Sequence, residues 1–185
     1  MNNEMLWVVM VMAGYLLGAI PFGIVVSKAM GLPDPRTVGS KNVGFTNVLR
    51  VSGKKAGILT LIGDMGKGWV MGFSATQMLQ QEWMILVVAL APFLGHLFSP
   101  FLRFKGGKGV ATAAGVLLAL DPWLGLATLA TWLLIAFTLR YSSLAALVAA
   151  AAAPLFAFFL WGGDVMLLAV GIIAMALIGK HWPNL

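Results

Sequence analysis

The sequence predicts an all-α integral membrane protein with seven transmembrane helices, and three observations lead to this expectation. Of the 185 residues, 61% are hydrophobic and only 10% are charged, whereas a soluble domain is about half apolar and about a quarter charged. Seven apolar stretches follow one another along the chain. The basic residues lie in alternate segments between those stretches. We therefore expect a single transmembrane domain over residues 1–185.

The apolar stretches differ in length. They cover residues 5–26, 56–78, 83–98, 109–120, 123–139, 144–161 and 165–178. The fourth and seventh are shorter than the ~17–25 residues that usually span a bilayer; each can borrow residues from its flanking loops, or the fourth can be re-entrant. In the first, Gly14 and Gly18 indicate close helix packing and Pro21 indicates a kink. Residues 1–4 lack the basic region of a signal peptide, so we expect the first stretch to be retained as a transmembrane helix.

Charge distinguishes the seven-span topology from the re-entrant one. With an external N-terminus and seven crossings, the internal segments hold Lys28, Arg36, Lys41, Arg50, Lys54, Lys55, Arg103, Lys105, Lys108, Arg140 and Lys180. The external segments hold no Lys or Arg, only the acids Glu4, Glu82, Asp121 and Asp164. Cytoplasmic loops are enriched in Lys and Arg. A re-entrant fourth stretch would move Arg140 and Lys180 outside, so we expect seven spans and a cytoplasmic C-terminus.

Composition also excludes several kinds of chemistry. The chain has no cysteine, which excludes disulfides, thiolate metal sites and a cysteine nucleophile. Its two histidines, His96 and His181, form no cluster with carboxylates at metal-ligand spacing. We therefore expect no metal and no cofactor. Nothing in the sequence points to nucleic acid or to an obligatory protein partner.

The stretch over residues 104–112 combines three glycines and two lysines just before an apolar run. Glycines let backbone N–H groups approach a ligand, and a helix N-terminus attracts anions. One interpretation is a phosphate-binding loop that uses Lys105 and Lys108. The other is a basic juxtamembrane loop that fixes topology or contacts anionic lipid. The stretch is not a Walker A loop, because Gly109 stands where a Ser or Thr would bind magnesium.

A second polar loop spans residues 39–50. Ser40, Asn42, Thr46 and Asn47 can bind hydroxyls or phosphate oxygens, and Arg50 can hold a phosphate in a bidentate fork. If Asn47 and Arg50 begin a short helix, their spacing places them on one face. The alternative is an ordinary polar turn whose Asn and Ser side chains cap a helix.

Three smaller polar groups remain. Asp64 and Lys67 lie in the second apolar stretch and can neutralise each other at i, i+3, so a structural pair is as plausible as a catalytic one. Residues 140–143 can form an interfacial anchor or a further phosphate contact. Residues 180–184 end the chain on the internal side with His181. All basic loops thus face one side, as expected for two anionic ligands, one of them with an apolar tail.

These motifs resemble those of the bacterial acyl-phosphate:glycerol-3-phosphate acyltransferases of the PlsY type, over the whole chain. The first family motif is similar to the pattern Gly39, Ser40, Gly44, Asn47 and Arg50. The second matches residues 104–112, preceded by Gly95-His96 and Pro100-Phe101. The third matches Lys180, His181 and Asn184. Phe45 stands where the family commonly has Ala, and the third motif usually continues with Ile, Arg and a later Glu, whereas this sequence ends at Leu185.

The resemblance implies an acyltransferase of phospholipid synthesis in the bacterial inner membrane, with its active site facing the cytoplasm. It would move a long acyl chain from acyl phosphate to glycerol 3-phosphate, giving 1-acylglycerol 3-phosphate and phosphate. We expect the transfer to be direct, without an acyl-enzyme, because the donor is already activated and Ser40 has no base nearby in sequence. We expect the catalytic residues to be Ser40, Arg50, Lys108 and His181. We expect substrate contacts from Gly39, Asn42, Gly44, Thr46, Asn47, Lys105, Gly106, Gly107, Gly109, Thr112, Arg140, Ser142, Ser143 and Asn184. The alternative function is a membrane transporter or binding protein for phosphorylated lipids.

Overall fold

The computed structural model describes residues 3–182, and all secondary structure in that part of the chain is helical. The elements are α1 (Asn3–Ala19), α2 (Phe22–Ala29), α3 (Phe45–Met78), α4 (Glu82–Leu97), the 3-10 helix η1 (Pro100–Leu102), α5 (Val110–Leu120), α6 (Pro122–Leu139), α7 (Ser142–Trp161) and α8 (Met166–His181). The expected all-α fold is confirmed. Every apolar stretch found in the sequence coincides with one or two of these helices.

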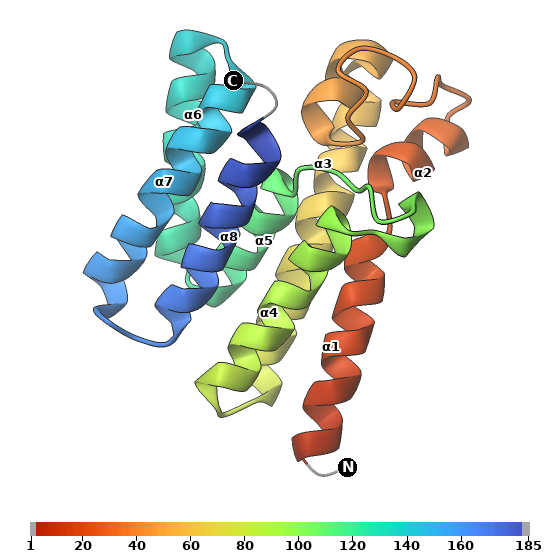
Figure 1. Ribbon diagram of the computed structural model, residues 1–185. Coiled ribbons are helices and arrows are strands. Elements are labelled where there is room, and N and C mark those ends of the chain that lie inside the picture. Colours follow the sequence, from red (N-terminus) through yellow and green to blue (C-terminus); the bar gives the residue numbers. More distant parts are fainter. Residues whose placement is uncertain (1–2, 183–185) are drawn as a thin grey trace.

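The helices form two groups that meet along α3 and α5 (Figure 1). In one group, α1 packs on α4 and both contact α3. In the other, α5, α6, α7 and α8 pack side by side in chain order. The start of α1 and the end of α8 lie at opposite ends of the bundle (Figure 1). The long loop before α3 lies at the same end of the bundle as the end of α8 (Figure 1).

Among the described residues, three helices are long and apolar enough to cross a membrane: residues 82–102, which comprise α4 and η1, then α6 and α7. The pair α1 and α2 meets the same criterion only when taken together. The apolar helices α5 and α8 are shorter, with 11 and 16 residues. Length and composition alone thus identify three spans, and four if the bent pair counts as one.

The first apolar stretch, expected as one kinked helix over residues 5–26, is broken into α1 and α2, which meet at an angle of 49°. Pro21 explains the break because its ring has no N–H to continue the helical ladder. The carbonyl groups left free at the break find side-chain donors. Ser99 Oγ donates to Ala19 O at 2.6 Å, and Lys67 Nζ donates to Ile20 O at 2.8 Å.

Helix α3 begins at Phe45, well before the second apolar stretch, and is interrupted at Gly53. Gly53 has φ of 87°, a conformation that glycine adopts without a steric penalty. The piece before the interruption carries Asn47 and Arg50, which confirms the expected short helix. Both residues line a cavity that the start of α5 also lines.

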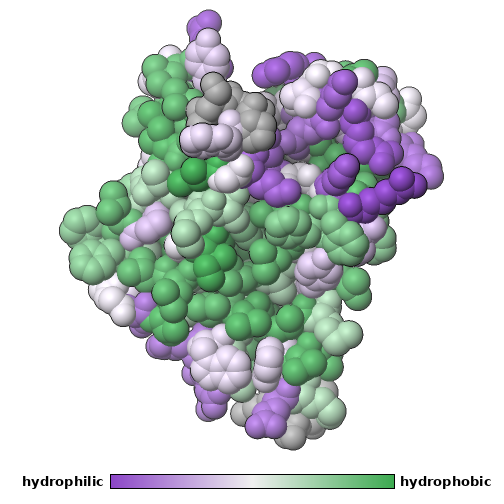
Figure 2. Space-filling view, in the orientation of Figure 1, coloured by the Kyte–Doolittle hydropathy of each residue, from purple (hydrophilic) through white to green (hydrophobic). Residues whose placement is uncertain are grey.

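The surface separates into an apolar body and a hydrophilic end (Figure 2). Large apolar side chains lie exposed around the body, among them Trp123 at 73%, Phe137 at 78% and Phe159 at 84%. The hydrophilic side chains gather mainly over the end that carries the loop before α3 (Figure 2). An apolar surface of this extent requires lipid rather than water as its surroundings.

Candidate active site

A cavity of about 660 Å³ lies between α3, α5, α6, α7 and α8. The residues that line it from loops and helix ends are mainly polar: Ser40, Asn42, Gly44, Thr46, Asn47, Arg50, Lys108, Gly109, Ser142, Ser143 and His181. The residues that line it from helix interiors are mostly apolar, and they include Leu117, Leu129, Leu133, Ala146, Ala150 and Ile173. The cavity therefore combines a polar region with room for an apolar chain.

A second cavity, of about 280 Å³, adjoins the first. Its walls are Arg36, Ser40, Lys41, Asn42, Val43, Lys105, Gly106, Gly107, Lys108 and Lys180. The two cavities share Ser40, Asn42 and Lys108. Five cationic side chains line the second cavity, and Arg36 is neutralised by an ion pair with Asp34 at 2.6 Å. Such a wall favours an anion.

Asn47 holds the loop before α3 in place. Its side chain is 3% exposed. Its Nδ2 donates to the carbonyl oxygens of Pro35, Val38 and Asn42 at 2.9, 3.2 and 2.8 Å, and its Oδ1 accepts from Ser40 N at 2.9 Å. The amide group is thus occupied by the loop, and its effect on the site is to fix the backbone of Ser40 and Asn42 between the two cavities.

The glycine–lysine loop is shaped by close contact with the end of α4. Gly106 N and Gly107 N donate to the carbonyl oxygens of Leu97 and His96 at 3.1 and 3.2 Å. A methyl group on Gly106 would collide with the His96 carbonyl oxygen, and one on Gly107 would collide with His96 Nε2. These two glycines therefore permit packing, and their N–H groups are not available to a ligand.

The loop nevertheless presents donors where it enters α5. Gly109 has φ of 84°, which turns the chain into that helix. Within the described residues, the N–H groups of Lys108 and Gly109 have no protein acceptor. With the unpaired N–H groups of the first turn of α5, they form a donor set that suits an anion.

Two cationic side chains line the same cavity as this donor set. Lys108 is half-buried, and desolvation lowers the pKa of its ammonium group. Arg50 is exposed and lines the larger cavity. Among the described residues, neither has a carboxylate partner, so both charges are free to pair with a ligand.

His181, at the end of α8, is 3% exposed and lines the larger cavity. Its Nδ1 lies 2.8 Å from Leu177 O. A carbonyl oxygen can only accept, so Nδ1 carries the proton and Nε2 of the neutral ring is left as an acceptor. His181 can therefore accept a proton or a hydrogen bond from a ligand.

The structure brings most of the residues selected from the sequence to the two cavities, but three of the described ones stand apart. Gly39 has φ of 61° and packs against Asn47. Thr112 is fully buried in α5 and lines neither cavity. Arg140 is exposed at the end of α6, away from both cavity walls. Asn184 lies outside the described residues.

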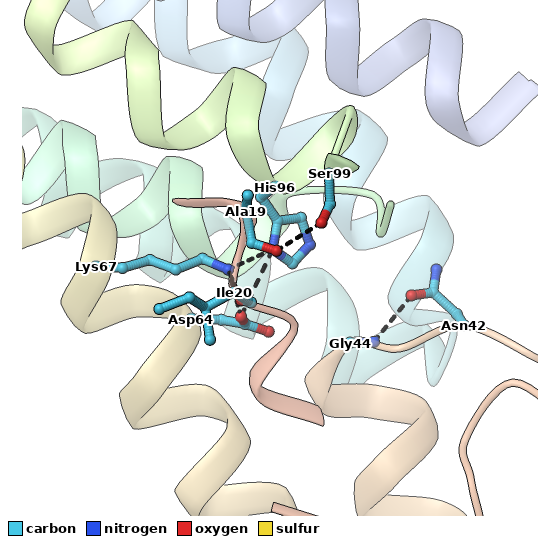
Figure 3. Close-up of polar contacts among 8 residues, drawn as sticks. All are labelled: Ala19, Ile20, Asn42, Gly44, Asp64, Lys67, His96 and Ser99. Carbon is cyan, nitrogen blue, oxygen red and sulfur yellow. Dashed lines mark hydrogen bonds and ion pairs between the residues drawn. The ribbon is translucent and has the colours of Figure 1, made fainter. Parts of the chain in front are cut away.

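Sequence reasoning did not join one buried cluster to the site. Asp64, Lys67 and His96 are 1%, 3% and 5% exposed, and they lie together where α3 passes α4 (Figure 3). The ion pair expected between Asp64 and Lys67 is present, with Oδ1 and Nζ 2.8 Å apart. Asp64 and His96 both line the larger cavity. The signal in the sequence that could have linked this cluster to the site was the position of His96, just before the segment that leads into the glycine–lysine loop.

The site offers two adjoining cavities with cationic side chains in their walls, of which one continues into an apolar pocket. Within residues 3–182 no group of His, Cys, Asp or Glu could hold a metal ion. The chemistry available to this arrangement is the binding of two anions side by side, with a histidine acceptor beside them.

Comparisons with known proteins agree with this arrangement. The sequence profile of the family described as "Glycerol-3-phosphate acyltransferase" matches residues 8–185. A curated glycerol-3-phosphate acyltransferase of Dechloromonas aromatica (strain RCB) is 60% identical, over 94% of this chain and 87% of that protein. One of Ralstonia nicotianae is 52% identical, over all of this chain and 91% of that protein.

Two solved structures are similar throughout. Both are described as PlsY (YgiH), an integral membrane glycerol 3-phosphate acyltransferase, one in the glycerol 3-phosphate form and the other in the lysophosphatidic acid form. The first superposes with a TM-score of 0.89 at 40% identity, and the second with 0.87 at 38%. Each covers 96% of this chain and 89% of the solved chain.

Proposed function

Because the chain belongs to the glycerol-3-phosphate acyltransferase family, we propose that it acylates the 1-hydroxyl of sn-glycerol 3-phosphate with acyl phosphate as donor. The products are 1-acylglycerol 3-phosphate and inorganic phosphate. The observation that carries the proposal is the pair of adjoining cavities that share Ser40, Asn42 and Lys108. Both substrates carry a phosphate, and only the larger cavity continues into an apolar space that suits an acyl chain.

The proposed reaction is a direct transfer. The substrate hydroxyl oxygen bonds to the acyl carbon, the bond from that carbon to the phosphate oxygen breaks, and phosphate leaves with the bonding electrons. Lys108, Arg50 and the free N–H groups at the start of α5 hold phosphate oxygens. Ser40 and Asn42 orient the reacting groups between the cavities. The hydroxyl proton passes to His181 Nε2 or to the leaving phosphate.

The test is phosphate release by the purified protein in detergent. With acyl phosphate alone, we expect no release above the spontaneous rate. Addition of glycerol 3-phosphate should start release, with 1-acylglycerol 3-phosphate appearing in equal amount. A transporter or binding protein for phosphorylated lipids would release no phosphate under either condition, and that result would refute the proposal. Glycerol, which lacks the phosphate, serves as the matched control acceptor.

We further propose that this multi-pass membrane protein crosses the bacterial inner membrane seven times. The site would face the cytoplasm, where glycerol 3-phosphate is dissolved. The distribution of Lys and Arg supports this orientation. The short helices α5 and α8 would cross with the help of their flanking residues. Membrane lipid is then the expected surrounding, and no cofactor, nucleic acid or protein partner is needed for the reaction.

Cysteine labelling tests this topology, because the natural chain has no cysteine. Gln80 and Gly163 are exposed near helix ends that we place outside, and Lys54 is exposed near the site. We expect Gln80→Cys and Gly163→Cys to react with a membrane-impermeant maleimide in intact spheroplasts, and Lys54→Cys to react only after permeabilisation. The opposite pattern would place the site on the wrong side of the membrane for its acceptor and would contradict the proposal.

A further inference from the structure

The buried cluster of Asp64, Lys67 and His96 has no part in the transfer described above, yet two of its members line the larger cavity. Lys67 Nζ lies 2.8 Å from each of three atoms: Asp64 Oδ1, Ile20 O and His96 Nδ1 (Figure 3). Burying three titratable groups together carries a large desolvation cost unless all are paired. Their hydrogen bonds therefore define which proton each group holds.

The ammonium group of Lys67 has three N–H donors and no acceptor. Asp64 Oδ1 and Ile20 O take two of them, and the remaining partner is His96 Nδ1. With Lys67 as the ammonium ion, its N–H at 2.8 Å pairs with an unprotonated Nδ1, and the carboxylate oxygen Asp64 Oδ1 lies farther from Nδ1, at 3.5 Å. The neutral His96 ring must then carry its proton on Nε2. The pair of Asp64 and Lys67 has no net charge, so the cluster is neutral as a whole.

The Nε2 atom of His96 lies against the glycine–lysine loop, so close to Gly107 that a Cβ atom on that residue would collide with it. Within the described residues, Nε2 has no protein acceptor. His96 lines the larger cavity, and Gly107 lines the smaller one. A free N–H group is thus held beside the glycine–lysine loop, whose residues line both cavities.

We propose that His96 is a further catalytic residue, whose Nε2–H donates a hydrogen bond to the acyl carbonyl oxygen; this role rests on the proposed function. As the hydroxyl attacks, the carbonyl π electrons move onto that oxygen, and they return when phosphate leaves. The proton stays on His96 throughout, so the residue stabilises charge and transfers nothing. Asp64 and Lys67 are positioning residues, because they hold the ring in the tautomer that can donate.

Two variants separate this role from a structural one. The amide of asparagine in His96→Asn can reach the position of Nδ1, where it accepts from Lys67, but it leaves no donor at the position of Nε2. The longer side chain in His96→Gln can place an N–H₂ donor at the position of Nε2 but leaves Lys67 without its acceptor. We expect His96→Asn to lower kcat about 100-fold with little change in KM, as for other oxyanion donors, and His96→Gln to retain more of kcat.

If His96 only supports the fold, the order reverses: His96→Asn keeps kcat, and His96→Gln loses thermal stability and activity together. That order would overturn the proposal. Should either variant fail to fold, ¹⁵N NMR of the histidine rings in the wild-type protein decides. With only two histidines in the chain, removal of one assigns both. We expect His96 to show a protonated Nε2 and an unprotonated Nδ1; the opposite tautomer or a doubly protonated ring would overturn the proposal.

The NMR result does not depend on turnover. A wild-type protein that shows the expected tautomer but releases no phosphate would therefore refute the proposed acyl transfer, and with it the catalytic role of His96, while leaving the buried hydrogen-bond chain intact. An active protein with the wrong tautomer would refute only the role of His96.

Discussion

Replacement of Lys108 with alanine is expected to lower kcat/KM about 10- to 100-fold, since a charge-assisted hydrogen bond contributes ~1.5–3 kcal/mol. Lys108 lines both cavities, is half-buried and has no carboxylate partner among the described residues. Its charge is therefore available to phosphate oxygens and only partly screened by water. Initial rates of phosphate release, with each substrate varied in turn, provide the measurement.

Arg50→Ala is expected to reduce kcat/KM similarly, and Arg50→Lys should restore it only in part. A lysine ammonium is a point charge and cannot reproduce the bidentate fork of a guanidinium. Lys54→Ala is the matched control, because Lys54 is exposed at the same end of the molecule but lines neither cavity. An equal loss in Lys54→Ala would show that the basic end acts only through its overall field.

Much of the fold could be predicted from the sequence because lipid-facing helices need long apolar runs. All apolar stretches coincide with helices, and Pro21 marked the break between α1 and α2. The start of α3 at Phe45 could not be predicted from an apolar run. Its first turns carry Thr46, Asn47 and Arg50, and the interruption at Gly53 separates them from the apolar run.

The candidate site was predictable to the extent that charge and glycine gather in particular loops. Sequence alone could not tell which groups face a ligand and which hold the loops together. The side chain of Asn47 and the N–H groups of Gly106 and Gly107 look like ligand donors in the sequence, but the fold uses them internally. The partners involved come from other segments of the chain, and only the folded structure brings them together.

The cluster around Lys67 shows the same limit more clearly. An Asp and a Lys one turn apart in an apolar helix predict an ion pair, and the pair is present. Its link to His96 crosses from α3 to α4 over 29 residues of sequence. The carbonyl of Ile20 enters from the break after α1. The spacing of residues within one helix cannot reveal a contact among groups from three separate segments of the chain.

The second large effect expected is the absence of any acyl-enzyme. Ser40 is the nucleophile that we would expect covalent catalysis to use, because the chain has no cysteine and Ser40 is the described serine that lines both cavities. A serine nucleophile needs a base within hydrogen-bonding distance. Within the described residues, the Ser40 hydroxyl has no hydrogen bond to either histidine, and only its backbone N–H is engaged, by Asn47. Acyl phosphate is already activated, so proximity of the two bound substrates can supply much of the rate.

We therefore expect sequential kinetics, in which both substrates must be bound before either product leaves. Intersecting double-reciprocal lines would be observed when the two substrates are varied together. Parallel lines, typical of a ping-pong reaction, would require an acylated enzyme. Ser40→Ala should weaken turnover through lost orientation of the substrates, without changing the kinetic pattern.

Direct transfer between substrates in adjoining cavities is the central claim, and one labelling measurement tests it. The purified protein is incubated with acyl phosphate carrying a radiolabelled acyl group, without glycerol 3-phosphate, and is then denatured and separated from free lipid. Direct transfer predicts that label on the protein stays at the background of a heat-inactivated sample, and that later addition of glycerol 3-phosphate to an undenatured aliquot moves the label into 1-acylglycerol 3-phosphate. Stoichiometric label on the protein that is lost in Ser40→Ala would contradict direct transfer and would make Ser40 the nucleophile.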